Sequence, residues 1–331
     1  MPGPDHMGGS GRPPSPPALA PAPAQPWRGS LRRLPWFAGA VLATLVFCAV
    51  FAPWLASKDP TAGDITTKLI PPIWMERGTM EHPLGTDRFG RDILSRIIHG
   101  SRISLLVSII AIGVAGTLGT ALGLIAGYRG GLTDTLLMRM TDIGLSLPTI
   151  LIAVVMVAVS EPSFRNVVLV IALLLWPRFA RQIRGETLAV KEQDFVALAV
   201  VAGRSGTWII ARHIFPNVVP TLLVISTLQV GYVILLEGTL GFLGVGVPPP
   251  NPAWGLMIAD GRGFLATAWW IALFPGLAML LTVLAVNLMG DWLRDHLDPK
   301  LRQAGARVTA ATATTAAPIE PAIAEAPARG D

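Results

Sequence analysis

The sequence of 331 residues is short of charge and of cysteine. Only 14% of its residues are charged, against roughly 25% in soluble domains, while 52% are hydrophobic. This composition predicts an integral membrane protein and argues against a soluble domain. The single cysteine, Cys48, excludes an intramolecular disulfide, and its place in an apolar run indicates a small buried hydrophobe. The formal net charge of +5 is explained better by basic cytoplasmic loops than by nucleic acid as a partner.

The motifs of several enzyme classes are also missing. Only four lysines are present and none follows a glycine, so the chain lacks a G-x-x-x-x-G-K-[ST] loop for nucleotide phosphates. The five histidines stand in tails and loops without the spacing of metal ligands. No apolar segment holds a histidine that could activate a serine, which argues against an intramembrane protease. We therefore expect no catalytic, cofactor-binding or metal site, and a membrane enzyme is disfavoured.

Long apolar runs predict an all-α membrane protein with six transmembrane helices, since about 20 apolar residues cross a bilayer. Glycines recur at every third or fourth position of the second run and predict a face on which another helix packs closely. The fourth run is short, and Pro148 interrupts the third. The expected spans are residues 36–55, 103–128, 136–159, 167–180, 218–240 and 264–289.

The two ends of the chain differ from its middle. Residues 1–33 and 303–331 are rich in Pro, Ala, Gly, Ser or Thr and are predicted to be disordered cytoplasmic tails, which leaves 34–302 as one membrane domain. The first apolar run follows a basic stretch but lacks a cleavage site, so we interpret it as an uncleaved span. Most basic residues favour cytoplasmic N- and C-termini, although the loop between the first two runs also contains arginines.

Two acidic residues lie within the expected spans. Asp142 follows Arg139 by three residues, so the two share a helix face and are expected to form a structural pair. Glu237 stands near the end of the fifth span, where it would face an aqueous vestibule or reach the surface. For both residues a structural role is the favoured interpretation.

A polar connection, residues 181–217, separates the fourth and fifth spans. Charges crowd its start, an apolar helical patch follows at 195–199, and Gly203 precedes a second short turn that ends at Pro216. A helix, a glycine break and a second helix predict a knob at the membrane surface, suited to docking into another protein. A solvated linker between two spans is the alternative interpretation.

This connection resembles the EAA loop of ABC-importer permeases, whose pattern is E-A-A, three residues, Gly, nine residues and I-x-L-P. The spacing is the same here, although Ala197 replaces the glutamate, Leu198 the central alanine, His213 the isoleucine and Phe215 the leucine. The resemblance implies coupling to an ATPase through Phe195, Ala197, Leu198, Ala199, Gly203, Phe215 and Pro216.

Three further motifs narrow the resemblance. They are H-P-L-G-T-D-x-x-G-R-D at 82–92, F-L-G followed by P-x-W-G within 242–255, and N-L-x-G-D-x-L-R-D-x-L-D-P at 287–299. Together with the loop they are similar to the C-type permease of the dipeptide, oligopeptide and nickel importer family, over residues 34–302.

The resemblance implies a type I ABC importer permease in the cell membrane, forming half of a pore with a homologous B-type permease. Two cytoplasmic ATPase subunits would hydrolyse ATP, and an extracytoplasmic solute-binding protein would deliver di- or oligopeptides. A nickel chelate or another small solute is the alternative cargo. A stand-alone secondary transporter is disfavoured, because no inverted repeat or mid-membrane charge is visible.

The same resemblance assigns two segments to the outer face. Residues 241–262 would face the binding protein, with Pro248, Pro252 and Trp254 as candidate contacts. The 82–92 motif would lie on that side too, either as a partner contact or as a packed structural plug over the helices.

Overall fold

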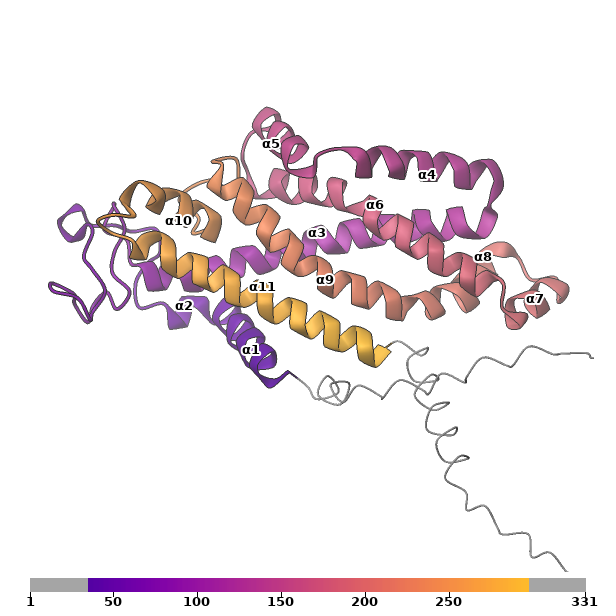
Figure 1. The fold of residues 1–331 in the computed structure, drawn as a ribbon, viewed down its shortest axis with the longest axis horizontal. Coiled ribbons are helices and arrows are strands. Elements are labelled where there is room, and N and C mark those ends of the chain that lie inside the picture. The colour runs from indigo at the N-terminus through magenta and orange to yellow at the C-terminus, as the bar shows by residue number, and fades with distance from the viewer. Residues whose placement is uncertain (1–34, 298–331) are drawn as a thin grey trace, which may run out of the picture. The chain divides into compact units, whose positions relative to one another are not determined.

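The computed structural model describes residues 35–297, so the expected disordered tails, 1–33 and 303–331, lie outside the described residues. Within this range the regular elements are helices, with one isolated β-bridge between Thr86 and Asp92. The elements, shown in Figure 1, are α1 (Trp36–Val50), α2 (Ala52–Leu55), η2 (Ile65–Thr67), α3 (Ile93–Arg129), α4 (Gly131–Ser146), α5 (Thr149–Ser160), α6 (Phe164–Lys191), α7 (Asp194–Val201), α8 (Gly206–Ile209), η3 (Ile210–Ile214), α9 (Phe215–Phe242), α10 (Trp254–Gly261), η4 (Arg262–Phe264) and α11 (Trp270–Leu297).

Four helical stretches of the described range are long and apolar enough to cross a membrane: α3, α6, the continuous Gly206–Phe242 stretch and α11. The α4–α5 pair makes a fifth if it is counted as one span. The 15 residues of α1 form a shorter apolar helix of about 22 Å, below the ~30 Å of a hydrocarbon core. The expected all-helical membrane architecture is therefore confirmed, and helix length and composition alone give four or five spans where six were expected.

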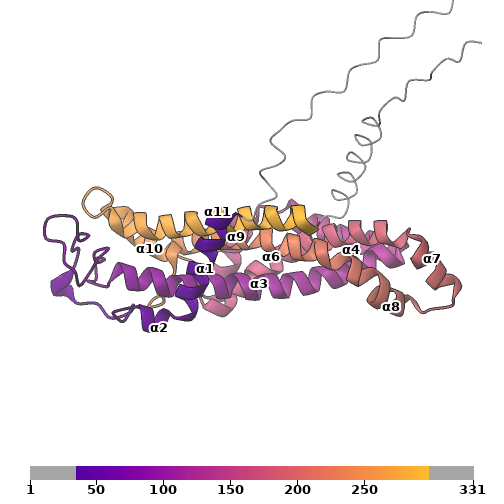
Figure 2. The same ribbon diagram turned by 90° about the horizontal axis from the view of Figure 1, so that it is seen from below.

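The long helices α3, α6, α9 and α11 run side by side (Figures 1 and 2). One end of this bundle carries residues 56–92 and α10, which we call the loop end. The other carries α7 and α8, which we call the α7 end. A central apolar core lies between α3, α5, α6 and α9, and a smaller core lies at each end.

The glycine face predicted for the second span is confirmed, and its neighbour is α6. A Cβ added at Gly119 would lie 2.5 Å from the carbonyl oxygen of Trp176, and one added at Gly123 would lie 2.6 Å from that of Ala180. Contacts this short leave no room for a side chain. The absence of side chains lets the two helix backbones approach closely along most of their length.

The first and third expected spans are broken. At the end of α1 the chain turns at Phe51 into α2, whose Pro53 has no N–H to continue the first helix. The 136–159 span was expected to be one interrupted helix, but α4 and α5 meet at 88°. Pro148 stands at the start of α5 and holds Leu147 in an extended conformation, which ends α4.

The fourth span was predicted too short. The sequence indicated 167–180 followed by a loop from 181, but α6 continues through Pro177 to Lys191. Its charged extension is stabilised by pairs with α4: Arg184 donates from Nε and Nη2 to the two carboxylate oxygens of Asp134, both at 2.6 Å. The connection between the spans is thus confined to the residues after Lys191.

The second and sixth spans begin elsewhere than predicted. The helix α3 starts at Ile93, ten residues before the expected start, because the Asp92 carboxylate caps it by accepting from the Ser95 N–H at 2.8 Å. The helix α11 starts at Trp270 and ends at Leu297, so the first residues of the expected 264–289 span belong to η4 and the turn after it.

Both intramembrane acids have partners other than those expected. Asp142 pairs with Arg181 of α6, at 2.5 Å, and not with Arg139. Glu237 is fully buried in this chain, and its Oε2 accepts from the Ser104 hydroxyl of α3 at 3.3 Å. It therefore neither lines an open vestibule of the described part of the chain nor reaches the surface, and its Oε1 has no hydrogen-bond partner there.

Candidate functional site: an exposed apolar helix at one end of the bundle

The segment that carries α7 is anchored at both ends on Tyr128, the penultimate residue of α3. Where α6 ends, Lys191 Nζ donates to the Tyr128 carbonyl at 2.7 Å and lies 5.6 Å from the centre of its ring. Where α8 begins, a Cβ on Gly206 would lie 2.8 Å from the same ring. The position of α7 is thus fixed by the end of a long bundle helix.

The end of α7 is set by glycine. Gly203 has φ +72°, in the left-handed region that favours glycine. Its N–H donates to the Val200 carbonyl at 3.0 Å, and the N–H of Arg204 donates to the Ala199 carbonyl at 3.2 Å. These two bonds are those of a Schellman motif, which ends a helix cleanly and reverses the chain. The predicted order of helix, glycine break and helix is confirmed.

The two faces of α7 are both apolar, but only one is covered. Val196 and Ala199 are buried in a cluster at this end of the bundle. On the other side Leu198 is 68% exposed and Val201 is 86% exposed, and Phe195 precedes them at the same three-residue spacing. The uncovered apolar face makes α7 a candidate interaction site.

After α8 the helix widens into a π-helical turn, η3, before α9. The N–H of Phe215 donates to the Ile210 carbonyl five residues back, and the next residue, Pro216, has no N–H to restore the α-helical pattern. The turn presents His213 between two aromatic rings. Its ring centre lies 5.8 Å from that of Phe195 on α7 and 5.1 Å from that of Trp208 on α8.

Most residues predicted for ATPase coupling lie on the surface at the α7 end. Phe195 and Leu198 belong to the exposed face of α7, Gly203 ends that helix, and Ala199 is the exception because it is buried beneath. Ala197, Phe215 and Pro216 are also exposed.

Sequence reasoning missed Val201 and Arg204 as parts of this surface. Val201 continues the three-residue spacing of Phe195 and Leu198, and that spacing could have revealed it. The Arg204 guanidinium lies 4.9 Å from the centre of the Trp208 ring, so it adds a positive charge at the edge of an apolar patch. No sequence signal predicts that contact.

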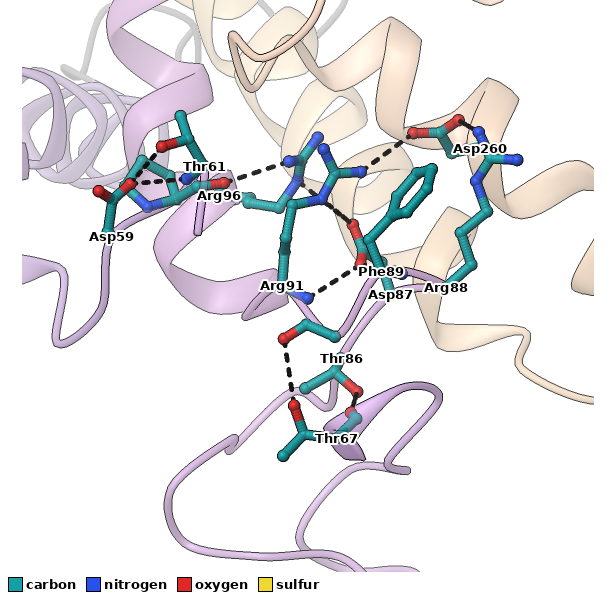
Figure 3. A network of polar contacts seen from close by, with 12 residues as sticks. Asp59, Thr61, Thr67, Thr86, Asp87, Arg88, Phe89, Arg91, Arg96 and Asp260 are labelled. Atoms are coloured by element: carbon teal, nitrogen blue, oxygen red, sulfur yellow. Dashed lines mark hydrogen bonds and ion pairs between the residues drawn. The ribbon is translucent and has the colours of Figure 1, made fainter. Parts of the chain in front are cut away.

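The loop end is built differently, from buried charges (Figure 3). Asp87 Oδ1 accepts from the N–H groups of Phe89 at 2.8 Å and Arg91 at 3.0 Å, and Oδ2 accepts from Arg91 Nε at 2.7 Å. Asp92, which caps α3, also lies 3.1 Å from His82 Nδ1. These contacts within the 82–92 motif agree with its interpretation as a packed structural plug.

The three candidate contacts for a binding protein differ in exposure. Trp254 and Pro252 are buried, and the Trp254 indole N–H donates to the Ile97 carbonyl of α3 at 3.0 Å. Pro248 is half-buried and leads into the exposed residues 249–251. In this conformation Trp254 fastens α10 to α3, and the 248–251 turn offers the accessible surface.

Comparison with known protein families gives two matches along this chain. Residues 119–303 match the model of the binding-protein-dependent transport system inner membrane component, and residues 26–72 match the N-terminal transmembrane domain of oligopeptide transport permease C. The first match covers the C-terminal part of α3 and the helices from α4 to α11.

Several curated proteins are similar over most of their length. The di/tripeptide transport system permease protein DppC of Pseudomonas aeruginosa is 44% identical over 78% of this chain and 86% of its own length. The dipeptide transport system permease protein DppC of Escherichia coli is 44% identical over 86% of this chain and 96% of its own. The probable D,D-dipeptide permease DdpC of Escherichia coli is 39% identical over 78% and 85%. This protein belongs to the family of inner membrane components of binding-protein-dependent transport systems.

Proposed function

We propose that this chain is the C-type permease subunit of an ATP-driven importer and forms half of its pore, together with a homologous B-type permease. The observation that carries the proposal is the exposed apolar face of α7, held rigidly at the end of the long helices. Family membership and the names of the peptide-permease relatives support it.

The proposed topology has six spans. They are α1, α3, the bent α4–α5 pair, α6, the Gly206–Phe242 stretch and α11, with cytoplasmic N- and C-termini. The helix α1 is shorter than the hydrocarbon core of a bilayer. Local thinning of the bilayer beside the bundle would accommodate it. With this topology the α7 end lies in the cytoplasm and the loop end outside.

Two ATPase subunits would dock on the cytoplasmic side, one of them on α7. The exposed Leu198 and Val201 would fill an apolar groove of that ATPase, which alone hydrolyses ATP. Closure of the ATPases would move α7, and its anchors on Tyr128 and the α9 start would pass the motion to α3 and α9. Alternating access would then follow as a switch between two helix packings.

Di- or oligopeptides are the proposed cargo, delivered by an extracytoplasmic solute-binding protein. The names of the relatives support peptides over nickel, because those proteins are described as peptide permeases. In this proposal the binding protein selects the peptide and the permease conducts it.

Affinity purification of the tagged chain from native membranes tests the proposal. We expect a second permease of the same family and ATPases with phosphate-binding loops in defined ratio, and ATP-dependent uptake of labelled dipeptide after reconstitution. Recovery of this chain alone, with uptake in liposomes that needs no ATP, would refute it.

A further inference from the structure

A pocket of about 380 Å³ opens at the loop end. Three segments that are distant in sequence line it: residues 61–65, residues 88–91, and the stretch from Pro249 to Asp260 that includes α10. The pocket is therefore formed by the folded loop end as a whole, and it lies outside the surface of α7 described above.

Two arginines in this pocket are held apart by an aromatic ring. The guanidinium carbons of Arg88 and Arg91 lie 4.4 and 4.6 Å from the centre of the Phe89 ring, and Figure 3 shows the ring between the two side chains. Cation–π contacts of this kind restrict the guanidinium planes, so both groups are oriented before any ligand arrives.

Both arginines share one carboxylate, that of Asp260 on α10. Arg88 Nη2 lies 2.9 Å from Asp260 Oδ1, whereas Arg91 Nη2 lies 3.5 Å from Oδ2 and makes no hydrogen bond. The Arg91 side chain is only 9% exposed. A buried guanidinium N–H without an acceptor is costly, and a further carboxylate on Arg88 would free Asp260 to turn toward it.

The charges around the pocket do not balance. Among residues 35–297, the side chains of Arg88, Arg91 and Arg96 contact two carboxylates, Asp87 and Asp260. The acids of the adjacent loop are engaged in their own turns: Asp59 accepts from Thr61 and Asp64 from Thr66. These hydrogen bonds hold the pKa of both carboxyls below the usual value, so both stay ionised but make no ion pair with the three arginines. The arginine group thus keeps one positive charge in excess.

We propose that Arg88, beside the buried Arg91, receives an aspartate or glutamate side chain from the surface of the solute-binding protein. The inference rests on the proposed function, which places the loop end outside the cell. A protein carboxylate fits better than a free peptide, because the pocket lies on loops beyond the helix bundle and Arg88 is 45% exposed. The incoming carboxylate would pair with the exposed Arg88 and leave Asp260 free to accept from the buried Nη2 of Arg91.

The first test measures the affinity of the co-purified binding protein for the complete importer in lipid nanodiscs. Arg88→Glu is expected to raise the Kd at least tenfold, and the wild-type affinity should fall with added salt. Lys68→Glu makes the same change of charge at an exposed position of the same loop outside the pocket, and its Kd should stay within twofold. Size-exclusion chromatography confirms that each variant complex is assembled.

The second test identifies the partner carboxylate. In an Arg88→Lys, Asp260→Asn double variant, carbodiimide would couple the new amine to an acid of the bound protein, and peptide mass spectrometry would locate the bond. The Asp260→Asn change removes the intramolecular competitor. Coupling to one surface Asp or Glu of the binding protein is the result expected.

The outcomes separate the two proposals. If the binding protein does not dock on the wild-type importer at all, the proposed function fails and the inference with it. If it docks with the same Kd on Arg88→Glu, the function stands and the inference is overturned. It is also overturned if free dipeptide, and not the binding protein, protects the amine of the Arg88→Lys double variant from acylation.

Discussion

The two ends of the helix bundle differ in whether their characteristic side chains find partners within the chain. At the loop end, buried charges pair with one another and with backbone N–H groups, as Asp87 and Asp92 show. At the α7 end, the helix turns Leu198 and Val201 outward, and none of the described residues covers them. The first arrangement stabilises the fold of a single chain, whereas the second leaves an apolar surface open, which an ATPase subunit covers in the proposed function. Substitutions at the two ends should therefore affect different properties.

Leu198→Asp should have the largest effect of the substitutions considered. It should weaken coupling to the ATPase and leave the stability of the fold unchanged. Placing a carboxylate at the centre of an apolar contact is expected to weaken ATPase binding by at least about 2 kcal/mol, roughly thirtyfold. The measurement is the ATPase recovered with the tagged chain and the uptake it supports. Met80→Asp, at a loop-end residue of comparable exposure, is the matched control and should recover ATPase normally. Equal losses in the two variants would contradict the division between the ends.

Asp92→Ala should instead lower stability. It removes the cap of α3 and leaves His82 without its carboxylate partner, so we expect a loss of about 1–3 kcal/mol in the free energy of unfolding. Thermal unfolding of the purified chain in detergent measures it. Asp64→Ala, at an exposed cap of the short η2, should change little. A melting temperature for Asp92→Ala equal to wild type would show that the loop end is not held by these charges.

Gly203→Asp should uncouple transport while leaving membrane insertion intact. A side chain at φ +72° costs roughly 1–2 kcal/mol, and the carboxylate lies beside the apolar face of α7. We expect uptake to fall about tenfold. Gly203→Asn places a side chain of similar size at the same positive φ but adds no charge. It therefore separates the effect of backbone strain from the effect of the charge. Normal uptake by Gly203→Asp would refute the assignment of this segment to coupling.

Gly123→Ala should have the smallest effect, midway between the ends. Its Cβ would lie 2.6 Å from the Ala180 carbonyl, so α3 and α6 must separate slightly, at a cost of about 1 kcal/mol. Gly113→Ala, on the same helix with nothing within 4 Å, should be neutral. The measurement is the melting temperature of each variant in detergent. A fall of the same size in Gly123→Ala and Gly113→Ala would contradict the close packing of α3 against α6.

Local patterns predicted the features that depend on neighbouring residues. The glycine spacing of α3 and the break at Gly203 both follow from helix period and backbone freedom. The helix α6 was cut short because Arg181 and Arg184 indicated solvent, whereas Asp142 and Asp134 of α4 neutralise them across the helix pair. Such partners are 39 and 50 residues away in sequence.

Other features depend on the direction of the chain and on distant contacts. Pro148 predicts an interruption but not the 88° bend that follows. The pairing of Arg88 with Asp260 joins residues 172 positions apart, and no local period indicates it. The sequence therefore did not predict the pocket at the loop end, although it did reveal the 82–92 motif that supplies the two arginines.

The most direct test of the account is site-specific photo-cross-linking in the reconstituted complete importer. Benzoylphenylalanine would replace Leu198 at the α7 end and, in a second variant, Met80 at the loop end. We predict a cross-link from position 198 to an ATPase subunit, stronger or weaker with the nucleotide bound, and none from position 80 to that subunit. A position 198 that captures only lipid, in a complex whose ATPases are present, would contradict the claim that α7 is the coupling surface.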